Sequence, residues 1–224
     1  MLMAIILNID TSQEIASICI AREGESLGVK FNDQQSDHAS WIHRAIQELL
    51  SETGLVLTQL DAIAVTIGPG SYTGLRVGLA SAKGLCYALN KPLICIPTLE
   101  MMAYAARFTD ATLICPMIDA RRMEVYAAIY DKNMNVVVPA EAVILEPATY
   151  ASYITAHPVC FCGSGSIKLQ TILQSQHARY EDIPFSAAEM SALSQQRFYL
   201  QDFASLAYAE PLYIKEFYTP GRRK

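Results

Sequence analysis

The clearest candidate for a functional segment lies between positions 66 and 84, in the sequence TIGPGSYTGLRVGLASAKG. An apolar segment, 62–67, runs into a glycine-rich turn, 68–71, and a helix is predicted to begin at Tyr72 or Thr73. Glycine lets a backbone approach a ligand closely, and the free N–H groups at a helix start attract negative charge. The arrangement is therefore typical of an anion site, although it matches neither a P-loop nor Gly-x-Gly-x-x-Gly.

A second candidate for phosphate chemistry is the turn 10–12, which follows the first predicted strand, 3–9. An acid followed by two hydroxyls can hold a phosphate or its magnesium, but these residue types also satisfy the backbone of an ordinary turn. Glu14 disfavours a phosphate, because a second carboxylate repels it unless a cation intervenes. Both interpretations stay open. The candidate phosphate-binding residues are Asp10, Thr11, Ser12, Gly68, Gly70 and Ser71.

The helix predicted at 73–89 carries small residues at every fourth position, namely Gly74, Gly78 and Ala82. A glycine inside a helix costs about 0.5–1 kcal/mol relative to alanine, so a close contact must compensate for it. An apolar stripe suited to packing on a sheet consists of Leu75, Leu79, Cys86 and Leu89. We predict that the small-residue face lies against a second backbone, and we favour another protein chain over internal packing.

Composition limits the classes to which the protein can belong. A chain of 224 residues that is 52% hydrophobic and 17% charged predicts a well-filled globular protein of one or two domains. The net charge of −5 gives no overall basic surface, which argues against nucleic-acid binding by this chain alone. Six cysteines lie in apolar segments, so we expect core thiols in a reducing cytoplasm. Neither a signal peptide nor an apolar run of about 18 residues is present, so no membrane contact is expected.

The order of the predicted elements indicates the fold class. Three strands within 3–31, a helix near 36–53, and then alternating strands and helices give the order β-β-β-α-β-α-β-α. A hairpin beside a right-handed parallel crossover is the arrangement of ribonuclease-H-like domains. The second half begins in the same way, because its first strand closes on Asp119 as the earlier one closes on Asp10. We predict an N-terminal lobe, 1–106, and a C-terminal lobe, 107–224, whose last segment can pack back on the first lobe.

Four segments together resemble the bacterial TsaB (YeaZ) family, and the resemblance covers nearly the whole chain. They are IDTS at 9–12, the glycine-rich stretch at 68–84, DARRMEVY at 119–126 and EPLYI at 210–214. The resemblance implies an α/β fold with two ribonuclease-H-like lobes of the actin/Hsp70/sugar-kinase superfamily. It also implies a non-catalytic subunit that binds and activates the paralogue TsaD and acts with the small ATPase TsaE. Their joint product would be threonylcarbamoyladenosine beside the tRNA anticodon.

The resemblance also indicates why this chain should lack catalysis. In TsaD the corresponding strand leads into His-x-Glu-Gly-His, whose histidines bind a metal, whereas this chain has TLEMM at 98–102. Thr98 and Met102 stand at the histidine positions, and neither replaces imidazole on a hard or borderline metal. We therefore predict no metal site, no catalytic residue and no enzyme activity. A peptidase is disfavoured as well, because no His-Glu-x-x-His or Ser/His/Asp order is present.

Tight nucleotide binding is not expected. Actin-like kinases have glycine in both phosphate loops, whereas the turns at 10–14 and 119–122 contain none. ATP or ADP at a heterodimer interface stays open. The alternative function is an ATP-dependent small-molecule kinase or ATPase of the same superfamily, which predicts magnesium-dependent ATP turnover that is lost in Asp10→Asn.

The family resemblance implies that the helices near 36–53 and 73–89 form a dimer surface. That surface would bind TsaD, would form a homodimer when TsaD is absent, and would reach tRNA only through the complex. Gly78→Leu is expected to abolish the heterodimer without unfolding the lobe, because glycine permits close approach. The predicted interface residues are Trp41, Ile42, Gly70, Tyr72, Thr73, Gly74, Arg76, Val77, Gly78, Ser81 and Ala82.

Overall fold

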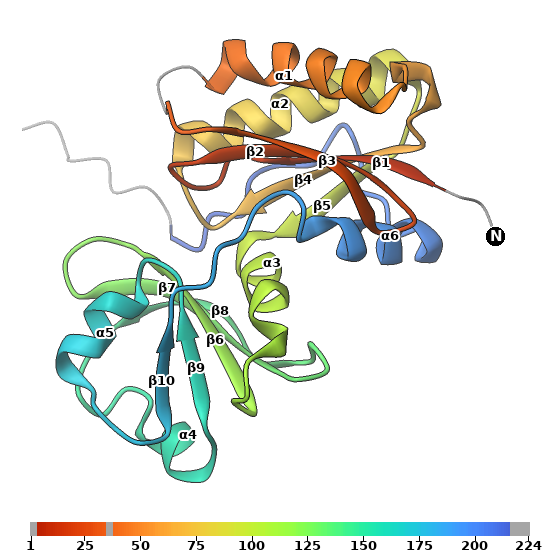
Figure 1. Ribbon diagram of the computed structural model, residues 1–224. Coiled ribbons are helices and arrows are strands. Elements are labelled where there is room, and N and C mark those ends of the chain that lie inside the picture. The colour runs from red at the N-terminus through yellow and green to blue at the C-terminus, as the bar shows by residue number, and fades with distance from the viewer. Residues whose placement is uncertain (1–3, 35–37, 216–224) are drawn as a thin grey trace, which may run out of the picture.

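The computed structural model describes residues 4–34 and 38–215 and consists of two lobes, each built on a five-stranded sheet (Figure 1). The first sheet has the order β3-β2-β1-β4-β5 and the second has the order β8-β7-β6-β9-β10. In both sheets the first three strands in the chain form an antiparallel meander and the next two add in parallel. The predicted α/β fold with two ribonuclease-H-like lobes is confirmed.

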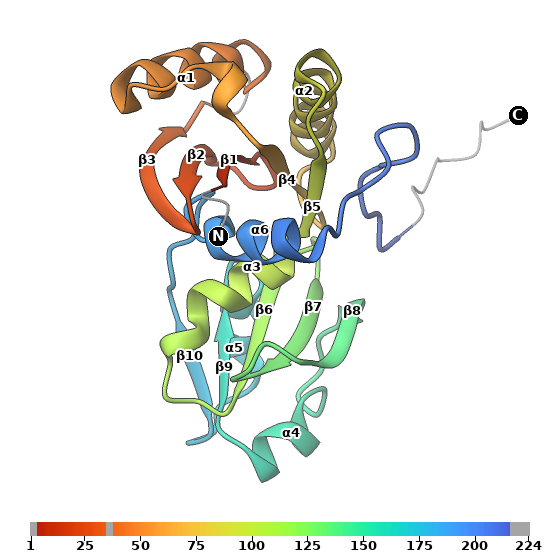
Figure 2. The ribbon, with the colours of Figure 1, turned by 90° about the vertical axis from the view of Figure 1, so that its right-hand side faces the viewer.

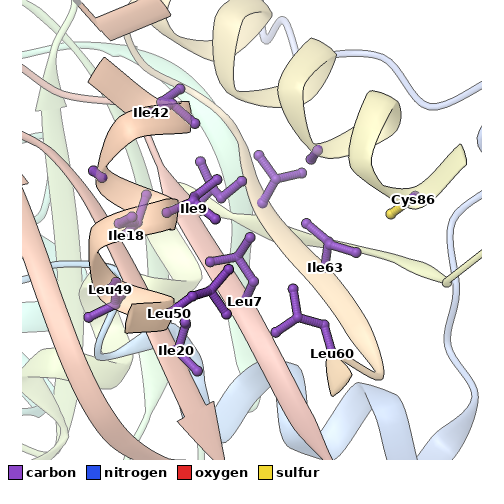
Figure 3. Packing of buried hydrophobic residues seen from close by; sticks show 14 of the residues in the cluster. Leu7, Ile9, Ile18, Ile20, Ile42, Leu49, Leu50, Leu60, Ile63 and Cys86 are labelled. Carbon is purple, nitrogen blue, oxygen red and sulfur yellow. The ribbon is translucent and has the colours of Figure 1, made fainter. Parts of the chain in front are cut away.

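Helices cover both faces of the first sheet, which explains why its central strands are almost continuously apolar. The face toward α1 (His38–Thr53) and α2 (Tyr72–Leu89) carries residues such as Leu7 and Ile63, as Figure 3 shows. The opposite face packs on α6 (Met190–Leu200). The predicted start of α1 at 36–37 lies outside the described residues. The strands are β1 (Ile5–Asp10), β2 (Ala16–Arg22), β3 (Glu25–Asn32), β4 (Ala62–Gly68) and β5 (Leu93–Pro97).

The second sheet is sandwiched in the same way. On one face lie α4 (Ala151–Ala156) and α5 (Ser166–Ile172), and on the other lies α3 (Thr98–Ala105), which also sends Met101 into the core of the first lobe. Short 3-10 helices span Leu57–Gln59 and Ala106–Phe108. The strands are β6 (Leu113–Asp119), β7 (Glu124–Asp131), β8 (Val136–Ile144), β9 (Val159–Cys162) and β10 (Ala178–Glu181).

After β10 the chain returns to the first lobe. The Ala187 N–H donates to Ser17 Oγ at 2.8 Å, and Arg197 Nη2 lies 2.9 and 2.7 Å from the two carboxylate oxygens of Glu100. The range 107–224, which we assigned to the C-terminal lobe, therefore includes a helix that completes the first lobe.

The residues after α6, 203–215, form an irregular segment that we call the strap. Its backbone is tied to the first sheet, since the Ala204 N–H donates to Leu93 O at 2.9 Å and the Leu212 N–H donates to Ile67 O at 2.7 Å. Lys83 Nζ on α2 donates to Ala209 O at 3.0 Å. Figure 2 shows the strap, in dark blue, beside β5 and α2. The strap thus covers the edge of the first sheet at β5.

Over the described ranges, no helix is both long and apolar enough to cross a membrane.

Candidate functional site

The β1–β2 turn is buried and bonded to its own lobe. Asp10 is 1% exposed, and its Oδ1 accepts from the Ser12 N–H at 2.9 Å and from Thr66 Oγ1 at 2.7 Å. Thr11 Oγ1 donates to Gly74 O at 2.7 Å. The hydrogen-bonding groups of this turn are therefore used mainly to hold α2 and β4 in place.

The glycine-rich turn approaches a backbone closely, as its composition predicts, and that backbone belongs to the same chain. A Cβ atom at Gly70 would lie 2.2 Å from Ser12 O. The Ser71 N–H donates to Ser12 O at 2.7 Å, while Ser71 Oγ caps α2 by accepting from the Gly74 N–H at 3.2 Å. The candidate phosphate-binding residues are thus brought together, but a phosphate between the two turns would have to displace Ser12.

The small-residue face of α2 is also filled from within. A Cβ atom at Gly74 would lie 2.0 Å from Thr11 O, and one at Gly78 would lie 2.2 Å from Thr11 Oγ1. Ala82 is fully buried. At Gly74 and Gly78 the close contact is made by the β1–β2 turn of the same chain and not by another chain, which corrects our expectation for these two positions.

Two further residues of the predicted interface lie in the core of the first lobe. Trp41 is 8% exposed and Ile42 is fully buried, and both pack between α1 and the sheet. With Gly74, Gly78 and Ala82, they are unavailable to a partner in this structure. The predicted interface residues that do reach the surface are Gly70, Tyr72, Thr73, Arg76, Val77 and Ser81.

A different side of α2 is open. We define the α2 outer face as Thr73, Val77, Ala80, Ser81, Gly84, Tyr87 and Ala88, all exposed or partly exposed and none charged. A Cβ atom at Gly84 would meet no atom within 4 Å, and Tyr87 is 86% exposed. Sequence reasoning missed Ala80, Gly84, Tyr87 and Ala88. The small residues among them recur every fourth residue like the buried stripe, and this repeat was the signal that could have found them.

The first turn of α2 is joined to the strap by aromatic and polar contacts. The Arg76 guanidinium carbon lies 4.0 Å from the centre of the Tyr72 ring, and Arg76 Nε donates to the hydroxyl of Tyr213 at 3.0 Å. The rings of Tyr72 and Tyr213 are 5.6 Å apart. Arg76 is therefore held beside the strap as it approaches the second lobe.

The β6–β7 turn repeats the aspartate of the β1–β2 turn in an exposed setting. Asp119 Oδ1 accepts from the Arg121 N–H at 2.6 Å and from Lys168 Nζ at 2.6 Å. Partial burial raises the pKa of the Asp119 carboxyl, but these two hydrogen bonds outweigh it and leave the pKa below its ordinary value. Arg121 and Arg122 have φ angles of 72° and 49°, in the left-handed region. The sequence analysis identified this turn as part of a family motif but did not predict that it forms an exposed surface.

The residues that replace the paralogue's histidines are packed in the interior. Thr98 begins α3 and is fully buried, and Met102 is 2% exposed and contacts Gly163. The glutamate between them, Glu100, is paired with Arg197. In the part of the chain that the structure describes, no three His, Cys, Asp or Glu residues gather into a group that could hold a metal ion.

All six cysteines are free thiols, and five of them are buried. Burial raises the pKa of Cys95 to about 11 and that of Cys86 to about 12, whereas a hydrogen bond from Cys162 lowers the pKa of the buried Cys160. Cys160 and Cys162 project from the same side of β9 into one apolar cluster, as their spacing predicts. The thiols are core residues.

Comparisons with known proteins agree with this architecture. The family model described as TsaD, tRNA N6-adenosine threonylcarbamoyltransferase, matches residues 13–211. The chain is 35% identical over 161 residues to the tRNA threonylcarbamoyladenosine biosynthesis protein TsaB of Bacillus subtilis, covering 70% of each chain. It is 37% identical over 131 residues to Escherichia coli TsaB, covering 58% of this chain and 56% of that one.

Among solved structures, a Pseudomonas aeruginosa protein described as similar to the peptidase YeaZ superimposes with a TM-score of 0.83. Its sequence is 27% identical, and the match covers 95% of this chain and 100% of that one. The resemblance stated from the sequence motifs is confirmed. The chain therefore belongs to the TsaB (YeaZ) family of tRNA threonylcarbamoyladenosine biosynthesis proteins.

Proposed function

We propose that this chain is a non-catalytic subunit that binds and activates TsaD in the threonylcarbamoylation of the adenosine next to the tRNA anticodon. Family membership supports a role in this modification. The observation that carries the proposed binding is the α2 outer face, a helix surface of small, uncharged residues with one exposed tyrosine. Exposed aromatic side chains beside small residues are suited to anchoring a partner helix.

The similarity to TsaD supplies a geometric argument for this partner. Because the chain matches the TsaD family model over most of its length, TsaD can be expected to carry an equivalent pair of helices on its own first lobe. Two related surfaces can pair about an approximate two-fold axis, as identical ones do in a dimer. In the absence of TsaD, two copies of this chain would pair through the same face.

The proposed lack of catalysis rests on the residues at the paralogue's metal-binding positions. Thr98 and Met102 are interior side chains, and Asp10 is engaged with Thr66 and Ser12. The reaction would take place on TsaD, in the cytoplasm, with TsaE as the ATPase. ATP or ADP at the interface between the two subunits is part of the same proposal.

The function is tested by measuring threonylcarbamoyladenosine on tRNA. Purified TsaD, TsaE and the synthase of the threonylcarbamoyl-adenylate donor are incubated with and without this chain. We expect product only when the chain is present. Equal product without it would overturn the proposal, and magnesium-dependent ATP turnover by the isolated chain would support the kinase or ATPase alternative.

The surface is tested by a bulky charge on the α2 outer face. Gly84→Arg should abolish association with TsaD in size-exclusion chromatography while the lobe stays folded, because no atom lies within 4 Å of the added Cβ. Ala156→Arg, at an exposed position of α4 in the second lobe, is the matched control and should bind as the wild type does. Normal binding by Gly84→Arg would contradict the assignment of this face.

A further inference from the structure

The β6–β7 turn presents two adjacent arginines to solvent. Both Arg121 and Arg122 are exposed, and within the described ranges neither guanidinium takes part in a hydrogen bond or an ion pair. Two neighbouring cations without a carboxylate partner repel each other and gain from an external anion. The turn therefore has unused binding capacity for negative charge.

The backbone at these arginines is held in a conformation that favours glycine or asparagine. Their φ angles of 72° and 49° place both residues in the left-handed region, where a Cβ atom crowds the following carbonyl. The turn is locked from both ends, since the Ala120 N–H donates to Glu124 O at 3.0 Å and the Glu124 N–H donates to Arg121 O at 3.1 Å. The fold thus fixes where the two arginine side chains leave the surface.

Further cations lie along the strap that joins the lobes. Lys215 Nζ binds Glu124 Oε1, and two residues earlier Tyr213 accepts from Arg76. In Figure 1 the strap comes down from the first lobe to the side of the second lobe on which β7 lies. We call these residues the basic stripe: Arg76, Arg121, Arg122, Lys168 and Lys215.

The carboxylates within the stripe do not neutralise the arginines. Asp119 is paired with Lys168 at 2.6 Å, and Glu124 is paired with Lys215. The excess positive charge is therefore that of the guanidinium groups, on a chain whose net charge is −5. Such local segregation of positive charge on an acidic protein indicates an anionic partner.

We propose that the basic stripe, centred on Arg121 and Arg122, contacts the phosphodiester backbone of tRNA in the complex with TsaD. Guanidinium groups bind phosphate oxygens in a bidentate manner, and a stripe that crosses two lobes fits a continuous polyanion. This inference rests on the proposed function, because the overall negative charge opposes RNA binding by the chain alone. The contact would add affinity and orientation without reading sequence.

The test is the salt dependence of tRNA binding by the TsaD complex. The double variant R121N/R122N removes both charges and keeps the turn, since asparagine tolerates positive φ. We expect its affinity to fall by about tenfold or more, and the slope of log Kd against log salt to fall by about 1–2, as the loss of two phosphate contacts predicts. R121K/R122K should retain most of the slope. Arg179→Asn, an exposed site on the same lobe, should change neither quantity.

The outcomes separate this inference from the proposed function. If R121N/R122N joins TsaD normally and binds tRNA with wild-type affinity and slope, the inference is overturned while the function stands. If the variant loses ADP binding but keeps tRNA binding, the stripe belongs to a nucleotide site and the inference is also overturned. If the wild type does not join TsaD, the proposed function fails. In that case the wild type and R121N/R122N are each titrated alone with tRNA at low salt. The inference is overturned if the two bind equally well or if neither binds.

Discussion

The two lobes repeat one fold unit and use its first turn in opposite ways. In each lobe the first strand ends on an aspartate whose Oδ1 accepts the N–H two residues later, at 2.9 Å from Ser12 and 2.6 Å from Arg121. In each lobe the fourth strand is followed by a Gly-x-Gly-Ser loop, at 68–71 and 163–166. The first aspartate is buried and the second is exposed.

The difference comes from where the glycine loop makes contact. In the first lobe Gly70 lies against Ser12, beyond the aspartate. In the second lobe a Cβ atom at the equivalent Gly165 would lie 2.9 Å from Met117 Cβ and 3.2 Å from the carbonyl carbon of Ile118, before the aspartate. The helices that follow also differ, with 18 residues in α2 and 7 in α5. The glycine loop of the first lobe thus packs against the β1–β2 turn itself. The glycine loop of the second lobe packs against the strand before the β6–β7 turn, and that turn stays on the surface.

The largest effect is expected where the first lobe's turn meets α2. Gly74→Ala should lower the free energy of unfolding by about 3 kcal/mol, the upper part of the range for overpacking, because its Cβ would lie 2.0 Å from Thr11 O. Gly84→Ala on the same helix should raise it by about 0.5–1 kcal/mol. Trp41, the single tryptophan, lies in this core and reports its unfolding by fluorescence in denaturant. Equal effects of the two variants would contradict the packing described.

The next largest effect is a difference in stability between variants of the two aspartates. Asp10→Ala should cost about 2 kcal/mol, because it leaves Thr66 and the Ser12 N–H without an acceptor in a buried site. Asp119→Ala should cost less than about 1 kcal/mol, since its side chain is 42% exposed and solvent screens its ion pair. Chemical denaturation followed by far-UV circular dichroism measures both variants. A larger cost at Asp119 would reverse the comparison.

A smaller effect of opposite sign is expected at the exposed turn. Arg122→Gly removes the strain of an arginine in the left-handed region, which costs about 1–2 kcal/mol. Part of this stabilisation is offset because glycine has more conformational freedom in the unfolded chain. We expect a net stabilisation of about 0.5 kcal/mol in the same denaturation experiment. Arg179→Gly, within β10, is the control and should destabilise the second lobe. A destabilised Arg122→Gly variant would show that this arginine supports the fold.

The smallest expected effect is a pH dependence of stability at the aspartate of the second lobe. The native pKa of Asp119 is lowered by Lys168 and the Arg121 N–H, so its contribution is present above the unfolded pKa of about 3.9 and is lost as pH falls through the native value. The stability difference between wild type and Asp119→Asn should be a few tenths of a kcal/mol at pH 6 and should vanish once the pH has fallen below the native pKa. A constant difference over this range would contradict the assigned pKa.

The order of elements could be predicted from the sequence because it depends on local patterns. Apolar strands, the glycine loop and the two strand-ending aspartates were enough to predict both lobes and the duplication. β10 escaped prediction, because its four residues, ARYE, lie at a sheet edge and show neither an apolar run nor a clear alternation.

The spacing of Gly74 and Gly78 places both on one face of a helix, so a backbone must approach both closely. That Thr11 fills this face, and that Gly84 six residues after Gly78 stays open, follows only from how the chain folds. In the same way, the motif at 119–122 was visible in the sequence, but its exposure depended on where a loop 40 residues later makes contact. The physical reason is that periodicity states which side chains share a surface, while the occupant of that surface is set by contacts between segments far apart in the chain.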